Sequence, residues 1–402
     1  MISSDFTRPM LVPESDSKIV LLVIDGLGGL PDPDTGRSEL DCAMLPNLDR
    51  IARSGSCGAL TPLGPGFTPG SGPAHLALFG YDPWRWRVGR GALSALGTGM
   101  DFRPGDLAAR LNFCSLDAGG RVTDRRAGRI STGECRHLCA LLEDIDVPGV
   151  EISLAPEMEY RAAILFRGEG LSPLLTESDP QKTGVPPSAV TALEEAASRT
   201  AAAVTGFLSE AEKRLKEQSP ANMVLIRGFG TFPEIPRFGE VYGLRGLAVA
   251  AYPMYRGVSQ AVGMSAVPGG DDLSSSCELV SRHWDLHDFF FIHFKKTDSA
   301  GEDGDFGEKV RLLEEVDASV PRLEELEPEV FAVTGDHSTP SLAKSHSWHP
   351  VPVAVASRWA QPHLGAAFSE QGCRNGSIGN IPSSSLMALL LAHAGRLRKF
   401  GP

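Results

Sequence analysis

The sequence lacks paired cysteines, long apolar runs and any excess of positive charge. Its seven cysteines are scattered along the chain without a CxxC pair, so we expect reduced thiols rather than a disulfide framework or a zinc ribbon. The first twenty residues carry five charged side chains, which leaves no apolar run of signal-peptide or membrane-span length. We therefore expect a cytoplasmic protein with no membrane partner.

The formal net charge is -12 at pH 7. This charge disfavours binding to nucleic acid or to an anionic membrane, although a local cluster of arginines can still bind a small anion. We expect a small-molecule ligand and no nucleic-acid partner. The composition leaves the oligomeric state open.

The chain of 402 residues is long enough for two domains. Aliphatic runs at 18–24, 287–295 and 329–334 are typical of strands covered on both faces. An acidic residue follows each run closely, and the three are Asp25, Asp298 and Asp336. In an open α/β sheet ligands bind at the carboxyl ends of the strands, so we expect these side chains to meet in one crevice.

Helical patterns alternate with these runs. Residues 46–54 begin with proline and stop at a glycine, and 306–326 carry apolar residues at helical spacing. This alternation predicts an α/β fold with a mainly parallel sheet flanked by helices.

The middle of the chain is different in character. It combines an arginine-rich stretch at 103–136 with an Ala/Glu-rich helix predicted at 188–217. We interpret residues 103–245 as an inserted, smaller α/β (α+β) domain. Residues 1–102 and 246–402 then form one discontinuous core domain.

Residues 68–83 read TPGSGPAHLALFGYDP, in which Ser71 follows a Pro-Gly turn and opens a helix. Free backbone N–H groups and the positive end of the helix dipole would stabilise an alkoxide-like oxygen and the phosphoryl group that it attacks. The alternative is a serine that serves only as the helix N-cap.

Residues 334–340 read TGDHSTP, with Asp336 and His337 directly after a strand and His346 a few residues later. Carboxylate and imidazole ligands suit zinc, manganese or iron. Asp298 and Glu302 lie in the acidic segment TDSAGEDGD. That segment does not match the EF-hand spacing, and a solvated acidic loop is the alternative.

These segments support one another. A serine hydroxyl is a weak nucleophile that needs a base or a metal to activate it. Two divalent ions roughly 3.5–4 Å apart can do this while they stabilise the attacking and leaving oxygens. The chain supplies enough ligands for two such ions.

Further motifs occur in a specific order: DG after the first strand, PGS, AHLALFGYDP, GRGALSALG (89–97), DRRAGR (124–129), RGFG (227–230), TGDHSTP and SHSWHPVP. In this order the sequence resembles the archaeal-type cofactor-independent phosphoglycerate mutases of the alkaline phosphatase superfamily, over nearly the whole chain. The resemblance implies an alkaline-phosphatase-like core with two divalent metal ions. It also implies isomerisation of 3-phosphoglycerate and 2-phosphoglycerate in glycolysis and gluconeogenesis, without a bisphosphoglycerate cofactor.

The resemblance assigns roles to individual residues. One metal ion would be held by Asp25, Ser71, Asp336 and His337, and the other by Asp298, Glu302 and His346. Ser71 would carry the phosphoryl group as a phosphoserine intermediate. Asp124 is a candidate proton carrier between the two glycerate hydroxyls, with a helix cap or an ion pair to an arginine as the alternative. The candidate substrate ligands are Arg90, Arg110, Arg125, Arg126, Arg129 and Arg227, because guanidinium groups bind phosphate and carboxylate in a bidentate manner.

The resemblance also implies a role for the inserted domain. A mutase must retain its glycerate and exclude water from the active site, so we expect this domain to be a substrate-binding lid.

Two positions depart from the family pattern. Glu302 stands where histidine is commonest, and Gly72 stands where many relatives have aspartate. A carboxylate hardens the site, which favours Mn²⁺ or Mg²⁺ and leaves Zn²⁺ or Co²⁺ as further options.

Two alternatives have a different chemistry. The first is another phosphoryl-transfer enzyme of the superfamily, either homoserine kinase-like or a phosphomonoesterase, although the sequence has no GxxxxGK[ST] loop. The second is a non-catalytic binding protein that keeps the fold. The clustered carboxylates argue against it, because they would be costly without a cation.

Overall fold

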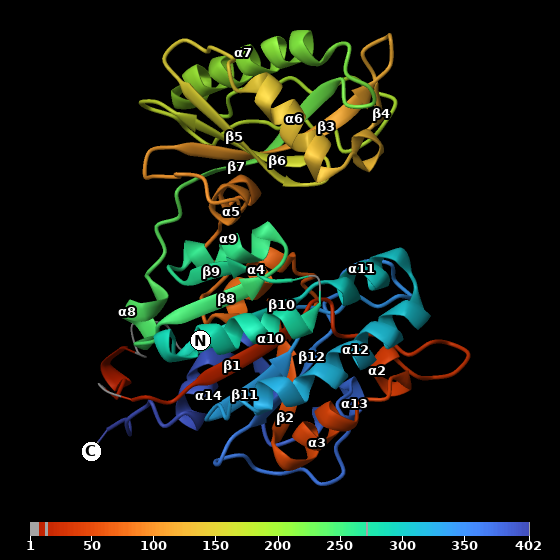
Figure 1. Ribbon diagram of the computed structural model, residues 1–402, viewed down its shortest axis with the longest axis vertical. Helices are drawn as coiled ribbons and strands as arrows, with labels where there is room; N and C mark the ends of the chain where they lie inside the picture. Colours follow the sequence, from red (N-terminus) through yellow and green to blue (C-terminus); the bar gives the residue numbers. More distant parts are fainter. Residues whose placement is uncertain (1–7, 13–14, 271, 402) are drawn as a thin grey trace. The chain divides into compact units, whose positions relative to one another are not determined.

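The computed structural model describes residues 8–12, 15–270 and 272–401. The chain forms two compact units (Figure 1), and each is described by itself. The first unit comprises the described residues of Met1–Arg87, Ile235–Tyr255 and Val262–Pro402, and the second comprises Val88–Glu234 and Arg256–Ala261.

The first unit contains an eight-stranded sheet with the order β13-β2-β12-β11-β1-β10-β8-β9. Its strands are β1 (Ile19–Ile24), β2 (Ser56–Thr61), β8 (Gly246–Ala250), β9 (Ser265–Pro268), β10 (Phe289–Phe294), β11 (Val330–Thr334), β12 (Val351–Ala356) and β13 (Gly379–Pro382). The run β11-β1-β10-β8-β9 is parallel throughout, whereas β12 is antiparallel to both of its neighbours. This arrangement confirms the predicted α/β class with a mainly parallel sheet, and β1, β10 and β11 lie within the predicted runs.

Helices cover both faces of this sheet. The helices of the first unit are α2 (Glu39–Cys42), α3 (Pro46–Ser54), α4 (Ser71–Leu78), α8 (Phe238–Tyr242), α10 (Leu273–Arg282), α11 (Lys296–Asp303), α12 (Phe306–Glu324), α13 (Glu370–Arg374) and α14 (Leu386–His393). One face packs α2, α3, α10 and α12 into a continuous apolar core with side chains such as Leu22 and Phe290. On the opposite face Phe291 of β10 meets Phe79, next to α4, in an edge-to-face ring contact. The alternation of Phe290 and Phe291 between the two faces explains why this strand is apolar at every position except His293.

The second unit is built on a five-stranded antiparallel sheet. Its strands are β3 (Leu107–Leu116), β4 (Val122–Asp124), β5 (Glu151–Met158), β6 (Arg161–Arg167) and β7 (Met223–Thr231). The order is β4-β3-β6-β5, with β7 also paired to β3. The long central strand β3 therefore organises this α+β unit.

The helices of the second unit pack on both faces of its sheet. Two of them, α6 (Thr132–Leu142) and α7 (Ser198–Leu215), cover the larger core on one face. On the other face α5 (Arg90–Gly97) lies directly on β3, and a Cβ added at Gly91 would come within 2.3 Å of the Ala109 Cα. Glycine is therefore required where α5 crosses the sheet. The helix α9 (Pro253–Ala261) contributes residues to both units.

The helix predicted at 188–217 is wrong at its start. It begins at Ser198, after a short 3₁₀ turn at Glu195–Ala197. The preceding segment is extended, because Leu193 N–H donates to the Leu174 carbonyl and Ser188 N–H to the Ser178 carbonyl. Backbone pairing has overridden the helical propensity of this segment.

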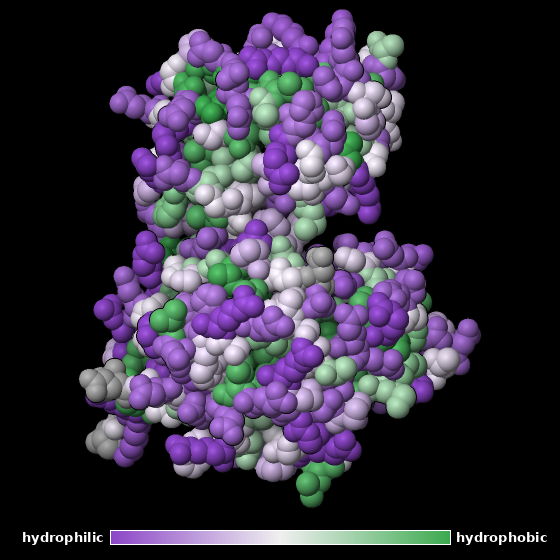
Figure 2. Space-filling view, in the orientation of Figure 1, coloured by the Kyte–Doolittle hydropathy of each residue, from purple (hydrophilic) through white to green (hydrophobic). Residues whose placement is uncertain are grey.

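The surface agrees with a chain that buries its apolar residues inside each unit. Figure 2 shows a face on which hydrophilic side chains predominate and apolar ones are scattered. Within the described part of the chain, every helix is too short or too polar to cross a bilayer.

Candidate metal centre and active site

The carboxyl ends of three neighbouring parallel strands carry the predicted acidic residues. Asp25 follows β1, Asp336 follows β11, and Asp298 lies in the first turn of α11 after β10. The register pairs Ile24 of β1 with Phe294 of β10. The side chains are therefore delivered to one edge of the sheet, as open α/β sheets do with their ligand-binding residues.

The first group of candidate metal ligands consists of Asp25, Asp336 and His337. One ligand atom from each lies within 4.8 Å of the others, and all three residues are fully buried. The Nε2 atom of His337 lies 3.1 Å from Asp336 Oδ2 and 3.5 Å from Asp25 Oδ1. Ser71 Oγ lies 3.3 Å from the same nitrogen, so Ser71 adjoins this group.

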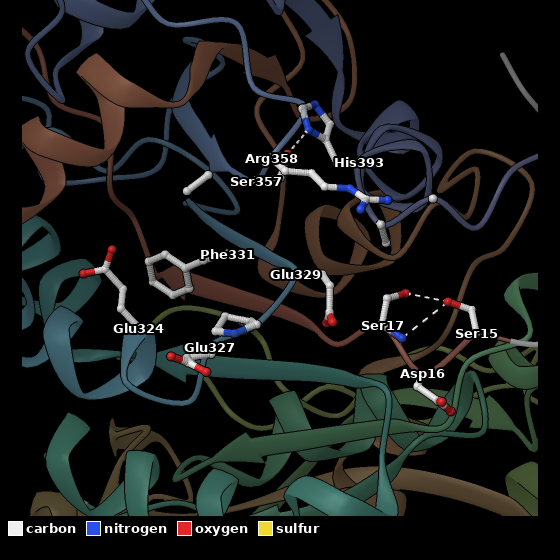
Figure 3. A pocket seen from close by; sticks show the side chains of 14 residues that line it. Ser15, Asp16, Ser17, Glu324, Glu327, Glu329, Phe331, Ser357, Arg358 and His393 are labelled. Atoms are coloured by element: carbon white, nitrogen blue, oxygen red, sulfur yellow. Dashed lines mark hydrogen bonds between the residues drawn. The ribbon is translucent and has the colours of Figure 1, made fainter.

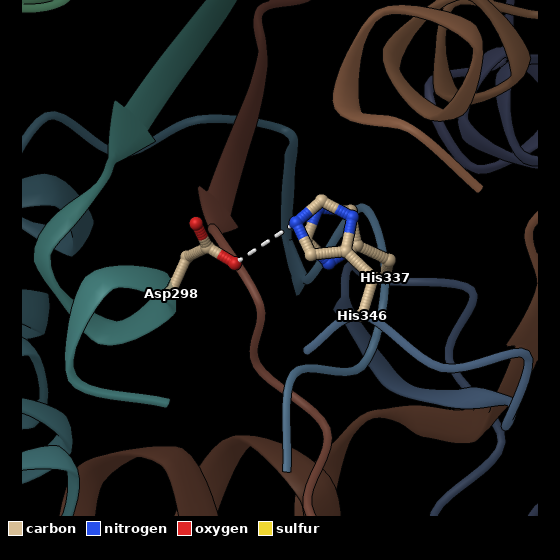
Figure 4. A group of neighbouring side chains, drawn as sticks. All are labelled: Asp298, His337 and His346. Carbon is tan, nitrogen blue, oxygen red and sulfur yellow. Dashed lines mark ion pairs between the residues drawn. The ribbon is translucent and has the colours of Figure 1, made fainter. Parts of the chain in front are cut away.

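The second group consists of Asp298, His337 and His346 (Figure 4), again with ligand atoms within 4.8 Å of one another. His346 Nε2 lies 3.4 Å from Asp298 Oδ1 and 3.7 Å from Glu302 Oε1. The rings of His337 and His346 are stacked with their centroids 3.7 Å apart. The two groups therefore adjoin one another and share His337.

The residues present fit divalent cations. Among the described residues, Asp25 Oδ1 and Asp336 Oδ2 are buried oxygens that accept no hydrogen bond. Leaving buried carboxylate oxygens unsatisfied is costly unless a cation neutralises them. A mixed set of carboxylate oxygens and imidazole nitrogens suits Mn²⁺, Zn²⁺ or Co²⁺.

The protonation of the two carboxylates nearest Ser71 is set by different neighbours. Burial raises the pKa of Asp336 well above its usual range, and the nearby charge of Asp25 acts in the same direction. Burial opposes ionisation of Asp25 as well, but Lys295 and the adjacent histidines hold its pKa well below the usual range. The pKa values of the two carboxyl groups are therefore shifted in opposite directions.

The pKa values of the two histidines in these groups, His337 and His346, are also shifted in opposite directions. Burial lowers the pKa of His337 to about 4, so its ring is neutral at neutral pH and able to bind a cation. Burial also lowers the pKa of His346, but the hydrogen bonds to Asp298 and to the Pro69 carbonyl, together with the charges of Asp298 and Asp25, outweigh it and raise that pKa above its ordinary value. Because a histidine ligand must be deprotonated, this shift opposes metal binding at His346.

Ser71 is placed for chemistry by the helix that it begins. The N-cap of α4 is Gly70, and Ser71 is the first helical residue, so the interpretation of Ser71 as an N-cap is wrong. Its carbonyl oxygen is 2.8 Å from Nδ1 of His75, which in turn lies 3.3 Å from Asp336 Oδ2. Ser71 thus sits at a helix N-terminus with its hydroxyl facing the metal-ligand groups.

Four further side chains at this site were missed by sequence reasoning. Lys295 Nζ lies 2.5 Å from Asp298 Oδ2 and 3.4 Å from Asp25 Oδ2, so one cation bridges both ligand groups. Its position directly after a buried, mainly apolar strand was a signal that could have revealed it. The other three are Tyr255, His293 and Thr339.

These three residues support the carboxylates. The Tyr255 hydroxyl donates to Asp25 Oδ2, and the His293 ring stacks on Tyr255 at 3.6 Å between centroids. The Thr339 hydroxyl donates to Asp298 Oδ1 at 2.7 Å. No sequence pattern indicated Tyr255, which is 230 residues from Asp25 along the chain.

All six candidate arginines belong to the second unit, and four of them lie around β3 and β7. Arg125 and Arg227 both pair with Asp179, at 2.7 and 3.3 Å. Arg110 lies opposite Arg227 across the β3–β7 pairing and binds Glu157 at 2.9 Å. Arg90 begins α5 and packs close to Gly228, the neighbour of Arg227.

The remaining candidates lie on one turn after β4. Arg126 and Arg129 are exposed there, and residues 127–129 have φ values of 45, 64 and 54°. The Asp124 carboxylate accepts hydrogen bonds at 2.7 Å from the N–H groups of Arg126 and Gly128. Asp124 therefore holds this left-handed turn in place.

A separate cavity of about 740 Å³ lies away from these groups (Figure 3). Its lining includes Ser17, just before β1, and Glu329, just before β11. Both residues precede their strands, so the cavity lies at the opposite edge of the sheet from Asp25 and Asp336. Figure 3 shows Arg358 and Glu329 among the side chains around this space. The cavity is not part of the metal centre.

Known proteins resemble the chain over nearly its whole length. The family model described as 2,3-bisphosphoglycerate-independent phosphoglycerate mutase matches residues 52–222. A Thermus thermophilus protein named "Probable 2,3-bisphosphoglycerate-independent phosphoglycerate mutase" is 48% identical over 396 residues, 97% of this chain and 98% of that protein. A Thermotoga maritima protein of the same name is 45% identical over 393 residues, 97% of both chains.

Solved structures agree with these relatives. The cofactor-independent phosphoglycerate mutase from Thermoplasma acidophilum superimposes with a TM-score of 0.69 at 29% identity, and the match covers 94% of this chain and 100% of that chain. The matches to the curated relatives cover 97% of this chain. The chain belongs to the 2,3-bisphosphoglycerate-independent phosphoglycerate mutase family.

Proposed function

We propose that the protein interconverts 3-phosphoglycerate and 2-phosphoglycerate without bisphosphoglycerate, through a phosphoserine on Ser71. The observation that carries this proposal is the position of Ser71 Oγ, 3.3 Å from His337 Nε2, at the residue shared by two groups of metal ligands. Family membership supplies the substrate class. This substrate class, an acid of glycolysis and gluconeogenesis, supports a cytoplasmic location for the enzyme.

We propose that one divalent ion is held by Asp25, Ser71, Asp336 and His337. The second is held by Asp298, Glu302 and His346. Such ions would lower the pKa of the serine hydroxyl and offset the charge of the phosphoryl oxygens. The oxygen-rich ligand set supports Mn²⁺ or Mg²⁺, with Zn²⁺ or Co²⁺ as weaker alternatives.

The chain's own residues account for the remaining steps. Ser71 Oγ attacks the phosphorus of 3-phosphoglycerate and loses its proton, the bond between phosphorus and the substrate O3 breaks, and O3 takes up a proton. The 2-hydroxyl of the retained glycerate then loses its proton and attacks the phosphorus of the phosphoserine, the bond to Ser71 Oγ breaks, and Ser71 Oγ takes up a proton as 2-phosphoglycerate forms. The positive end of the α4 dipole stabilises the negative charge at Ser71 during both transfers.

We further propose that the inserted domain is a lid that binds the substrate. Arg90, Arg110, Arg125 and Arg227 gather in one region of the second unit, which supports a shared phosphate or carboxylate site. Arg126 and Arg129 extend the same role to the exposed turn. Asp124 is the proposed proton carrier, since its carboxylate is anchored at the base of that turn.

One assay tests the proposal. Metal-stripped protein is given 3-phosphoglycerate and then Mn²⁺, Mg²⁺, Zn²⁺ or Co²⁺ in turn, while 2-phosphoglycerate and free phosphate are both followed. We expect metal-dependent 2-phosphoglycerate with little free phosphate. Free phosphate alone would identify a phosphomonoesterase instead, and an absence of turnover with every ion would reject the proposed reaction.

A further inference from the structure

A fully buried lysine lies beneath the metal centre. Lys309, in the first turn of α12, is 0% exposed. Its Nζ donates to the carbonyl oxygens of Gly28 at 3.0 Å and Thr339 at 2.8 Å. Burial lowers the pKa of this ammonium group, and Glu39, with Oε1 3.7 Å away, opposes that shift. A buried cation of this kind is costly unless its hydrogen bonds and charge partners are in place.

The two carbonyls that Lys309 holds belong to the two loops that carry the first ligand group. Gly28 lies three residues after Asp25, and Thr339 lies two residues after His337. The loops also touch directly, since Thr339 N–H donates to the Gly28 carbonyl at 3.0 Å. Lys309 therefore cross-links the loop after β1 to the loop after β11.

Thr339 connects Lys309 to both ligand groups. Its backbone carbonyl binds Lys309, while its hydroxyl donates to Asp298 Oδ1 and lies 3.1 Å from His337 Nδ1. A contact at Nδ1 fixes the ring orientation of a metal-binding histidine and leaves Nε2 for the cation. Lys309 thus acts on Asp298 and His337 through a single threonine.

Two carboxylates complete the support. Glu39 of α2 accepts the Ser341 N–H at 2.8 Å, and Glu370 of α13 accepts the Gly29 N–H at 2.6 Å. Gly29 directly follows Gly28, and Ser341 lies two residues after Thr339. Each carboxylate therefore holds a residue close to a carbonyl group that Lys309 contacts. A Cβ added at Gly29 would come within 1.9 Å of Glu39 Oε2, so the loop lies directly against this carboxylate.

We propose that Lys309 is a positioning residue for the metal centre, which sets the spacing of the Asp25 loop and the His337 loop through the carbonyls of Gly28 and Thr339. Glu39 and Glu370 hold the same two loops and neutralise the buried ammonium group. The inference rests on the proposed metal centre, and it adds a residue that touches neither metal ion nor substrate. Its effect must therefore appear in the affinity for the ion itself.

The test measures Mn²⁺ binding to metal-stripped protein by calorimetry and by the electron paramagnetic resonance signal of free Mn²⁺. All measurements are made at a temperature where every variant is folded. Four proteins are compared: the wild type, Lys309→Met, Lys309→Met/Glu39→Gln and Leu323→Ala. The double variant removes the ammonium group together with the charge left unpaired, so its thermal stability recovers towards the wild type. Leu323 is buried at the far end of the same helix and serves as a control for stability alone.

We expect Lys309→Met to weaken Mn²⁺ binding by roughly 10- to 100-fold, as the loss of outer-shell support does at metal sites. The double variant should regain stability but keep the weak binding, because the two carbonyl contacts are still absent. Leu323→Ala should lose stability and bind Mn²⁺ as the wild type does.

Two results would overturn the inference while leaving the metal centre intact. One is a double variant that binds Mn²⁺ within about threefold of the wild type. The other is a loss of affinity in Leu323→Ala that matches its loss of stability. If the wild type binds none of Mn²⁺, Mg²⁺, Zn²⁺ and Co²⁺, the metal centre itself is rejected, and the role of Lys309 with it.

Discussion

The hydroxyl oxygen of Ser71 lies 3.3 Å from Nε2 of His337, and this contact joins the proposed nucleophile to the metal ligands. Ser71→Ala removes the oxygen that would carry the phosphoryl group. We expect mutase activity to fall by roughly 10⁴-fold or more, as when a covalent nucleophile is deleted from other enzymes. The measurement is turnover of 3-phosphoglycerate in an enolase-coupled assay with saturating Mn²⁺.

Two controls isolate the role of the hydroxyl. Mn²⁺ binding to Ser71→Ala should weaken only slightly, since Asp25, Asp336 and His337 remain in place. Ser319→Ala deletes a hydroxyl on α12 whose contact is the Glu315 carbonyl of the preceding turn, so it should be as active as the wild type. Equal rates for Ser71→Ala and Ser319→Ala would remove Ser71 from the mechanism.

The fold around this contact could largely be predicted from the sequence. The strands β1, β10 and β11 are buried on both faces, and such strands can be recognised in the sequence as mainly apolar runs whose ends mark the ligand-binding edge. Asp25, Asp298 and Asp336 followed directly from those ends. Ser71 was found because a Pro-Gly turn before an apolar helix marks a helix N-terminus.

The supporting residues could not be predicted, and the reason is physical. Lys309 lies in a polar-looking stretch of α12, and a lysine in such a helix normally faces water. Its burial depends on two loops that are distant in sequence and supply carbonyl oxygens to its ammonium group. Tyr255 likewise meets Asp25 through a direct hydrogen bond from a distant part of the chain, and His293 of β10 stacks on the Tyr255 ring. Such contacts arise from tertiary packing, which has no local signature.

Lys295 lies between the two ligand groups, and its removal should lower the stability of the metal-free protein. In Lys295→Met the carboxylates of Asp25 and Asp298 lose the cation that pairs with both. We expect metal-free protein to lose about 1–3 kcal/mol of unfolding free energy at pH 7, less than for a fully buried pair because the lysine side chain is 30% exposed. Urea denaturation in the presence of a chelator measures this loss.

Added Mn²⁺ should narrow the difference, because the ion replaces the missing positive charge and stabilises the folded state by mass action. The neighbouring Lys296 is exposed, so Lys296→Met provides a control that should leave the metal-free stability unchanged. A Lys295→Met variant as stable as this control would show that the bridge contributes nothing.

Glu302 tests how the ligand set selects its ion. Its Oε1 lies 3.7 Å from His346 Nε2, on the open side of the second group. Glu302→His exchanges a hard oxygen ligand for an imidazole, which suits Zn²⁺ and Co²⁺ better than Mn²⁺ or Mg²⁺. We expect the ratio of Zn²⁺ to Mn²⁺ affinity to rise by roughly tenfold, within the range that ligand changes produce. Competition titrations of the metal-stripped protein give this ratio.

The adjacent Asp303 is also exposed, and Asp303→His adds the same imidazole one residue away. That control should leave the ratio near its wild-type value. A shift of equal size in both variants would mean that the added histidine binds ions at the surface, and Glu302 would no longer count as a ligand.

His75 gives the metal-free protein a pH dependence of predictable sign. Burial lowers the pKa of His75 to about 3, far below the ordinary value of about 6.5. The unfolded chain therefore binds a proton that the folded chain refuses, and stability is lost as the pH falls from about 6.5 towards the folded value. One such group contributes a slope of up to about 1.4 kcal/mol per pH unit. His337, whose pKa is lowered to about 4, contributes with the same sign.

His75→Asn should remove the contribution of one proton to this slope, which is up to about 1.4 kcal/mol per pH unit, between roughly pH 6.5 and 4.5. In that range the carboxylates still ionise in the unfolded chain. The measurement is the unfolding free energy of metal-free protein at a series of pH values, for the wild type and the variant. Asparagine keeps a polar group near the Ser71 carbonyl, which His75 Nδ1 contacts at 2.8 Å, so helix α4 retains a partner there. Parallel curves for the two proteins would mean that His75 is not neutral in the folded state, and the buried neutral imidazole beneath Asp336 would have to be abandoned.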